Sequence, residues 1–297
     1  MTMRREAWFY SDGLKISAVI YQPADLRPGE RRPGIVCCHG YSGMKDAYLL
    51  PVPERLAEVG YAAMAFDHRG FGQSEGTRAR LIPLEQAADI GNALTFLEQQ
   101  PEVDPGRLGL YGTSFGGANV VYVAANDPRV KVTVATVAIG DGERWLRSLR
   151  PFYEWREFRR RLDEDRRRRV LTGESERVEL SELMPGNPAS QAVQRDKFRS
   201  HLTYTGGYPL ENAEATLGYK PERDVHLIAP RPILFITVEN DGLVPPDESR
   251  SLHARAGDPK KLVVIPGADH YDVYQPVNPE VFELVMKESA DWYAQHL

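Results

Sequence analysis

The chain alternates between short apolar runs and longer stretches in which apolar residues recur at helical spacing. The segment 6–23 is predicted to form two strands joined by a turn at Ser11, Asp12 and Gly13. Further buried strands are predicted at PGIVCC, YAAMAF, RLGLYG, VKVTVATVAI, PILFITV and KKLVVI. Helical patterns separate most of these runs. Strands that alternate with helices are typical of βαβ units, so the sequence predicts an α/β protein with a mostly parallel central sheet flanked by helices.

The alternation stops in residues 141–229, which contain no convincing parallel strand. Instead, Trp145, Trp155 and Phe158 belong to a stripe of apolar residues spaced by three or four positions, which is typical of helices. Pro151 is expected to separate two helices there. We interpret 141–229 as a helical cap inserted before the last two core strands, and residues 1–140 and 230–297 as the core. The stripe is expected to be partly internal packing and partly a roof that binds substrate. Tyr204, Tyr208 and Tyr219 are further candidates for that roof.

Composition is that of an ordinary globular protein and excludes several classes. The 297 residues carry a formal net charge of −5, which gives no basic field for nucleic acid or an anionic membrane. No apolar run approaches the roughly 20 residues that span a bilayer, and no secretory signal is evident. The two cysteines, Cys37 and Cys38, are neighbours on a predicted strand and point to opposite faces, so no disulfide and a cytoplasmic location are expected.

An arginine-rich run in the insertion, RRRLDEDRRRR, allows two interpretations. It could form a patch that binds anions or nucleic acid. The acidic residues within it favour a solvated helix face with intrahelical ion pairs, which is the more common role of such a run.

A candidate nucleophile lies in the stretch LGLYGTSFGGANVV. Gly112 to Gly116 match the pattern G-x-S-x-G, in which a strand ends in a sharp turn that lifts a serine above the sheet. The pattern places Ser114 at the carboxyl end of a strand, where the sites of parallel sheets gather. A serine hydroxyl needs a neighbouring base before it can attack a carbonyl.

The base and its acidic partner are expected after two later strands. Among the histidines, His270 follows the last predicted strand in IPGADH, and we predict that it is the base. Asp241 lies directly after the preceding strand and is the favoured carboxylate; Asp141, which also follows a strand end, is the alternative. The remaining histidines are predicted to be surface, insertion or loop-shaping residues: His39, His68, His201, His226, His253 and His296.

The motifs HGYSG, DHRGFGQSEG, GTSFGG, ENDGLVP and GADH occur in an order that resembles the α/β-hydrolase superfamily over nearly the whole chain. Esterases, dienelactone hydrolases and X-Pro-dipeptidyl-peptidase-like enzymes are the most similar branches. The resemblance implies a catalytic triad in the order Ser114, Asp241, His270. It also implies an oxyanion hole formed by the backbone N–H of Phe115 and by Tyr41, through either its amide or its phenol.

Three functions are compatible with these residues. The first is a serine carboxylesterase that cleaves a small or medium ester, lactone or thioester. The second is an amidase or aminopeptidase-like hydrolase of the same fold, and the third is a binding protein whose chemistry has lapsed. We expect a small acyl substrate, no cofactor, no metal and neither nucleic acid nor membrane as partner; a homodimer is compatible with the sequence but not indicated by it.

Overall fold

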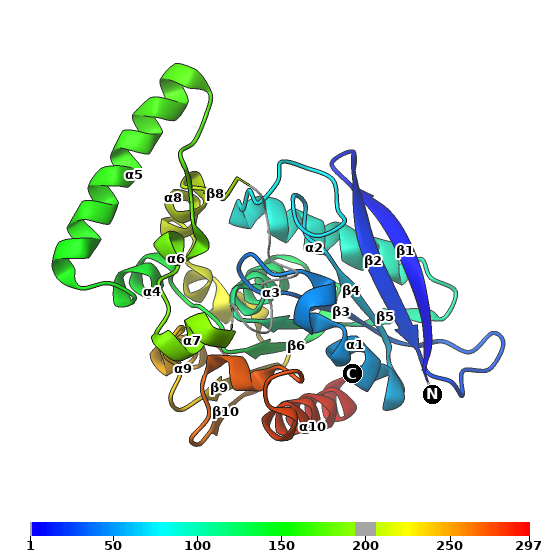
Figure 1. Ribbon diagram of the computed structural model, residues 1–297. Helices are drawn as coiled ribbons and strands as arrows, with labels where there is room; N and C mark the ends of the chain where they lie inside the picture. Colours follow the sequence, from blue (N-terminus) through cyan, green and yellow to red (C-terminus); the bar gives the residue numbers. More distant parts are fainter. Residues whose placement is uncertain (1, 194–205) are drawn as a thin grey trace.

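The computed structural model of the chain describes residues 2–193 and 206–297. Its centre is a sheet of eight strands in the order β1-β2-β4-β3-β5-β6-β9-β10 (Figure 1). The strands are β1 (Met3–Ser11), β2 (Leu14–Gln22), β3 (Arg32–Cys38), β4 (Ala62–Phe66), β5 (Val103–Thr113), β6 (Val130–Thr136), β9 (Ile233–Val238) and β10 (Lys260–Ile265).

The sheet is antiparallel at one edge only. β1 and β2 form the expected hairpin, in which Ser11 pairs with Leu14, and β2 runs antiparallel to β4. Every other pair of neighbouring strands is parallel. The carboxyl ends of β3 to β6, β9 and β10 therefore meet at one edge, and the predicted α/β architecture is confirmed.

Helices cover both faces of the sheet. α2 (Pro83–Glu98), α3 (Phe115–Asn126) and α9 (Pro246–Arg255) pack on one face, and α1 (Pro51–Glu58) and α10 (Pro279–His296) on the other. The Cys38 side chain belongs to the first core cluster and that of Cys37 to the second. Both thiols are buried and free, because adjacent residues of a strand point to opposite faces.

The described part of the segment between β6 and β9 is mainly helical and lies beside the carboxyl edge of the sheet (Figure 1). Pro151 separates its first two helices, and the second of these, α5, extends away from the body of the molecule. The elements of its described part are α4 (Gly142–Ser148), α5 (Phe152–Thr172), β7 (Arg177–Val178), α6 (Leu180–Leu183), α7 (Pro188–Val193), β8 (Tyr208–Pro209), α8 (Glu211–Leu217) and the 3-10 helices Pro221–Arg223 and Val225–Ile228.

A charge cluster with two buried carboxylates attaches this segment to the core. Glu248 of α9 is 2% exposed and accepts hydrogen bonds from the backbone N–H groups of Gly140 and Asp141. Arg144 of α4 donates to Glu248 at 2.6 Å and to Glu222 at 2.8 Å. Because hydrogen bonds to charged groups are among the stronger ones, the cluster fixes where α4 starts relative to the sheet.

Within the described residues, no helix is long and apolar enough to cross a membrane.

Candidate active site

Ser114 occupies a strained turn between β5 and α3. Its backbone adopts φ 57° and ψ −121°, a conformation that non-glycine residues adopt only where the surrounding structure enforces it. The Ser114 N–H donates to the carbonyl of Thr136 at 2.8 Å, which ties the turn to the neighbouring strand β6.

Two glycines make this turn possible through close backbone contacts. A Cβ atom on Gly112 would lie 2.2 Å from the carbonyl oxygen of Gly116, and one on Gly116 would lie 2.4 Å from the carbonyl oxygen of Cys38. Neither space admits a side chain. The glycine pattern of the sequence is therefore a steric requirement of the turn.

His270 and Asp241 are in direct contact. His270 Nδ1 lies 2.8 Å from Asp241 Oδ2, and both side chains are buried. The second oxygen of the carboxylate accepts the N–H groups of Leu243 and Val244 at 2.9 and 2.6 Å. These hydrogen bonds fix the carboxylate, so Nδ1 is the protonated nitrogen and Nε2 is left as the basic one.

Asp141 is placed differently. It caps the N-terminus of α4 by accepting the N–H groups of Glu143 and Arg144, and it forms an ion pair with Lys220 at 3.0 Å. Of the two candidate carboxylates, the structure brings Asp241 to His270 and uses Asp141 as a helix cap.

The loop after β3 runs beside Ser114 and is held by two buried rings. The Gly40 N–H donates to the Tyr48 hydroxyl at 3.1 Å. His39 Nδ1 lies 2.9 Å from the Gly40 carbonyl, and His39 Nε2 accepts the His68 N–H at 3.2 Å. Burial, reinforced by the neighbouring His68, lowers the His39 pKa from 6.5 to about 3. His39 is therefore a neutral residue that shapes the loop.

A buried ion pair joins this loop to the one after β4. Lys45 Nζ lies 2.8 Å from Asp67 Oδ2, and their side chains are 1% and 0% exposed. Asp67 also accepts the backbone N–H groups of Lys45 and Gln73. Burial acts to lower the Lys45 pKa, but Asp67 and Asp46 together outweigh it and hold the pKa above its ordinary value. Lys45 carries no signal in the sequence, because nothing in its local pattern marks it as buried.

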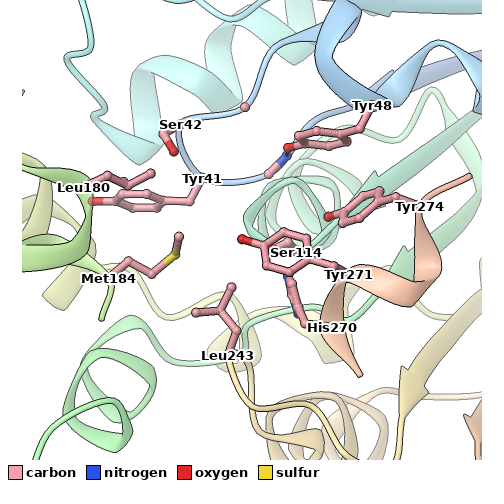
Figure 2. Close-up of a pocket in the computed structure, with 12 residues that line it drawn as sticks. Tyr41, Ser42, Tyr48, Ser114, Leu180, Met184, Leu243, His270, Tyr271 and Tyr274 are labelled. Atoms are coloured by element: carbon pink, nitrogen blue, oxygen red, sulfur yellow. Dashed lines mark hydrogen bonds between the residues drawn. The ribbon is translucent and has the colours of Figure 1, made fainter. Parts of the chain in front are cut away.

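Tyr41, Phe115 and Trp145 form a buried aromatic cluster. The Tyr41 ring lies 5.2 Å from that of Phe115 and 5.5 Å from that of Trp145. The Trp145 indole also donates to the carbonyl of Leu243, two residues after Asp241. Figure 2 shows the Tyr41 phenol pointing away from Ser114, with its hydroxyl beside Leu180.

Ser114 and His270 line one narrow cavity of about 30 Å³, which is enough for a water molecule (Figure 2). Met184 and Leu243 point into it from the side opposite Tyr48 and Tyr274. The described residues that line it are Gly40, Tyr41, Ser42, Gly43, Tyr48, Ser114, Leu180, Met184, Leu243, His270, Tyr271 and Tyr274.

The stripe predicted to roof the pocket lies behind this lining. Trp145, Trp155 and Phe158 are not among the residues that line the cavity at Ser114. All three belong to a buried cluster that also includes Tyr41 and Phe115. Among the described residues of 141–229, Leu180 and Met184 reach the cavity. They belong to a short helix and its C-terminal end, for which the sequence offers no periodic signal.

Two residues named from the sequence, His201 and Tyr204, lie outside the described residues. Within the described ranges, no group of three or more His, Cys, Asp or Glu side chains could hold a metal ion.

The sheet is mostly parallel, and it carries a serine on a glycine-lined turn between a strand and a helix. An Asp–His pair from later in the chain lies at the same edge. These features define an α/β hydrolase. A hypothetical protein of Pseudomonas aeruginosa has the same fold: the TM-score is 0.84 at 23% identity, covering 100% of this chain and 94% of that one. The family described as serine aminopeptidase S33 matches residues 29–273. The chain belongs to this family of α/β hydrolases.

Three relatives align over most of their length. An uncharacterized 31.7 kDa protein of Escherichia coli is 31% identical over 90% of this chain and 92% of its own. The quorum-quenching protein AidA of Acinetobacter baumannii is 27% identical, over 96% and 92%. A thiohydrolase of Eupenicillium brefeldianum is 25% identical, over 91% and 88%.

The Lys45–Asp67 pair is expected to stabilise the fold. Lys45→Met would leave the Asp67 carboxylate buried without a countercharge, so we expect the free energy of unfolding to fall by about 3 to 5 kcal/mol, measured by urea denaturation. The matched control is Asp46→Asn, which removes the half-exposed partner of Lys45 at 3.1 Å and should cost less than about 1 kcal/mol. Equal losses in the two variants would contradict a special role for the buried pair.

Proposed function

We propose that the protein is a serine hydrolase that cleaves small or medium carboxylic esters, lactones or thioesters through an acyl-enzyme. The observation that carries the proposal is the 2.8 Å contact between His270 and Asp241 at the edge of the cavity that holds Ser114. Such a contact fixes the histidine tautomer and stabilises the imidazolium that forms during acyl transfer.

In the proposed reaction, the Ser114 Oγ attacks the carbonyl carbon while His270 Nε2 takes the hydroxyl proton. The bond to the leaving group then breaks, and the same nitrogen returns the proton to the departing alcohol or thiol. Water, activated by His270, hydrolyses the acyl-enzyme and restores the serine. Asp241 keeps its negative charge throughout and orients the ring.

Two backbone N–H groups are proposed to stabilise the oxyanion. Phe115 is the first residue of α3, so its N–H has no acceptor within the helix. The second donor is proposed to be the Tyr41 amide, since the Tyr41 phenol is directed away from Ser114. The aromatic cluster with Trp145 would hold both backbones in place before the substrate binds, as oxyanion stabilisation requires.

The walls of the cavity support the proposed substrate class. Leu180, Met184 and Leu243 offer aliphatic and thioether surface to one side of Ser114, which suits an apolar acyl or alcohol chain. The relative named as a thiohydrolase supports thioesters as members of the proposed class. The family's description as serine aminopeptidase favours the alternative, an amidase or aminopeptidase-like enzyme. The proposed partner is a small acyl compound in the cytoplasm, with no nucleic acid, membrane or cofactor involved.

A panel of matched ester, lactone, thioester and amide substrates, assayed on the wild type and on Ser114→Ala, tests the reaction class. We expect hydrolysis of an oxygen or sulfur ester that is lost in Ser114→Ala. Turnover of the amide alone would replace the proposal by its alternative, and activity that survives in Ser114→Ala would contradict the nucleophile.

A fluorophosphonate probe should label Ser114 stoichiometrically in the wild type, as read by peptide mass spectrometry. The label should be lost in His270→Ala, because the hydroxyl is reactive only next to its base. Full labelling at another residue, with Ser114 unmodified, would refute the assignment.

Asp241→Asn should keep the fold and lower kcat by about 10³- to 10⁴-fold, because the amide favours the wrong histidine tautomer. Asp141→Asn is the matched control, since it changes a helix cap. It should leave kcat within a few-fold of wild type and lower Tm slightly. The reverse pattern would assign the acid to Asp141.

Chain-length preference should depend on the residues that line the cavity. Met184→Ala should change the ratio of kcat/KM between short and long acyl esters by about tenfold, because a methylene in an apolar pocket contributes roughly 1 to 3 kcal/mol. Trp155→Ala, behind the lining, should lower Tm through lost packing and leave that ratio flat. A shifted profile in Trp155→Ala with none in Met184→Ala would contradict this assignment of the pocket.

A further inference from the structure

The outer face of α5 exposes apolar side chains to an unusual degree. Five large apolar side chains of the described residues are at least two-thirds exposed, and all but Tyr10 lie on this helix. They occur in two groups at its ends: Phe152 and Tyr153 are 67% and 70% exposed, and Val170 and Leu171 are 81% and 83% exposed. An exposed apolar group at each end of a protruding helix is a feature of interaction surfaces.

One residue of each group, Tyr153 and Leu171, belongs to a regular row along the helix. Tyr153 and Leu171 are separated by about five full turns, so they have the same direction. Between them, exposed residues follow at alternating spacings of four and three, the spacing of a coiled-coil seam. We call this set the outer row: Tyr153, Glu157, Arg160, Glu164, Arg167 and Leu171.

The outer row is opposite the face of α5 that packs onto the rest of the protein. The buried residues of the helix are Trp155, Phe158, Leu162 and Asp165, which lie roughly half a turn away from Tyr153 and Leu171. Figure 1 shows α5 standing clear of the body, so its outer side is accessible. A partner can reach the outer row without displacing any described element.

We infer that the outer row binds the outer row of a second copy of this chain, with the two α5 helices antiparallel about a twofold axis near Leu162. The outer row is complementary to a second copy of itself that runs in the opposite direction. Tyr153 would contact Leu171 of the second copy, Glu157 would contact Arg167, and Arg160 would contact Glu164. Each contact occurs twice, as a twofold interface requires. A parallel pairing would instead place like charges opposite each other at every charged position.

The charges of the row are available for such an exchange. Arg160 pairs within the helix with Glu157 and Glu164, and all three are more than half exposed. Arg167 forms no ion pair with the described residues, and a second copy would supply its carboxylate. Two helices of this length in contact bury a small area, so we expect a reversible dimer that depends on protein and salt concentration.

The test uses charge reversal and mixing of full-length chains. Arg160→Glu alone would oppose Glu164 of its copy, and Glu164→Arg alone would oppose Arg160, so each variant should dimerise at least about tenfold more weakly than wild type. In an equimolar mixture of the two variants every contact is again between opposite charges. Sedimentation equilibrium at low salt should then show dimers re-forming with an affinity near that of wild type.

A matched control reverses the exposed intrahelical pair Lys287–Asp291 of α10, which has the same spacing outside the outer row. Lys287→Glu and Asp291→Lys should leave dimerisation unchanged. Circular dichroism of the α5 variants separates loss of assembly from loss of helix, and only a contact between chains can be restored by mixing.

The orientation is tested by disulfide cross-linking, since Cys37 and Cys38 are buried and cannot compete. Tyr153→Cys chains mixed with Leu171→Cys chains should cross-link under mild oxidation, and either variant alone should not. Three results would overturn the inference. The wild type could stay monomeric at every concentration, or the mixture of charge variants could dimerise no more tightly than either variant alone. The third result is cross-linking of Tyr153→Cys chains to one another.

Discussion

The site depends on the contact between the first turn of α3 and the end of β3. Gly116 lies so close to the Cys38 carbonyl that no side chain could fit between them. The residues that follow Cys38, His39 to Tyr41, therefore run directly beside Ser114, which begins the same turn of α3. A single methyl group at Gly116 would push apart the serine and the loop that carries the proposed second oxyanion donor.

The contact between α3 and the loop after β3 needs further interactions that hold the loop, because loops at the edge of a sheet have few neighbours. Here the loop after β3 is held by the Tyr48 hydroxyl, by the neutral His39 and by the buried Lys45–Asp67 pair. Replacing a buried ion pair by apolar residues often costs nothing, so stability alone does not explain it. Its hydrogen bonds to the backbone fix the relative position of two loops, which is what a preorganised site requires.

The sequence predicted the sheet, the serine turn and the candidates Asp241 and His270, because each depends on local rules: apolar runs, glycines where backbones approach, and polar residues after strands. It left Asp141 open as an alternative, since a residue after a strand end can equally cap the next helix. Lys45, Leu180 and Met184 carried no signal. Their environment is made by elements distant in sequence, and neither periodicity nor composition encodes which elements will face each other.

The aromatic stripe shows where helical spacing stops being informative. Spacing identified a buried face on α5, but not what that face touches. The Arg150 guanidinium lies over the Phe158 ring, with its carbon 3.7 Å from the ring centre. The same guanidinium donates hydrogen bonds to the carbonyls of Glu182 and Leu183 at the end of α6. Burial lowers the Arg150 pKa to about 10, which still leaves it charged at neutral pH. Phe158 is thus linked to the cavity only indirectly, because Arg150 connects it to the backbone at the end of α6, next to Met184.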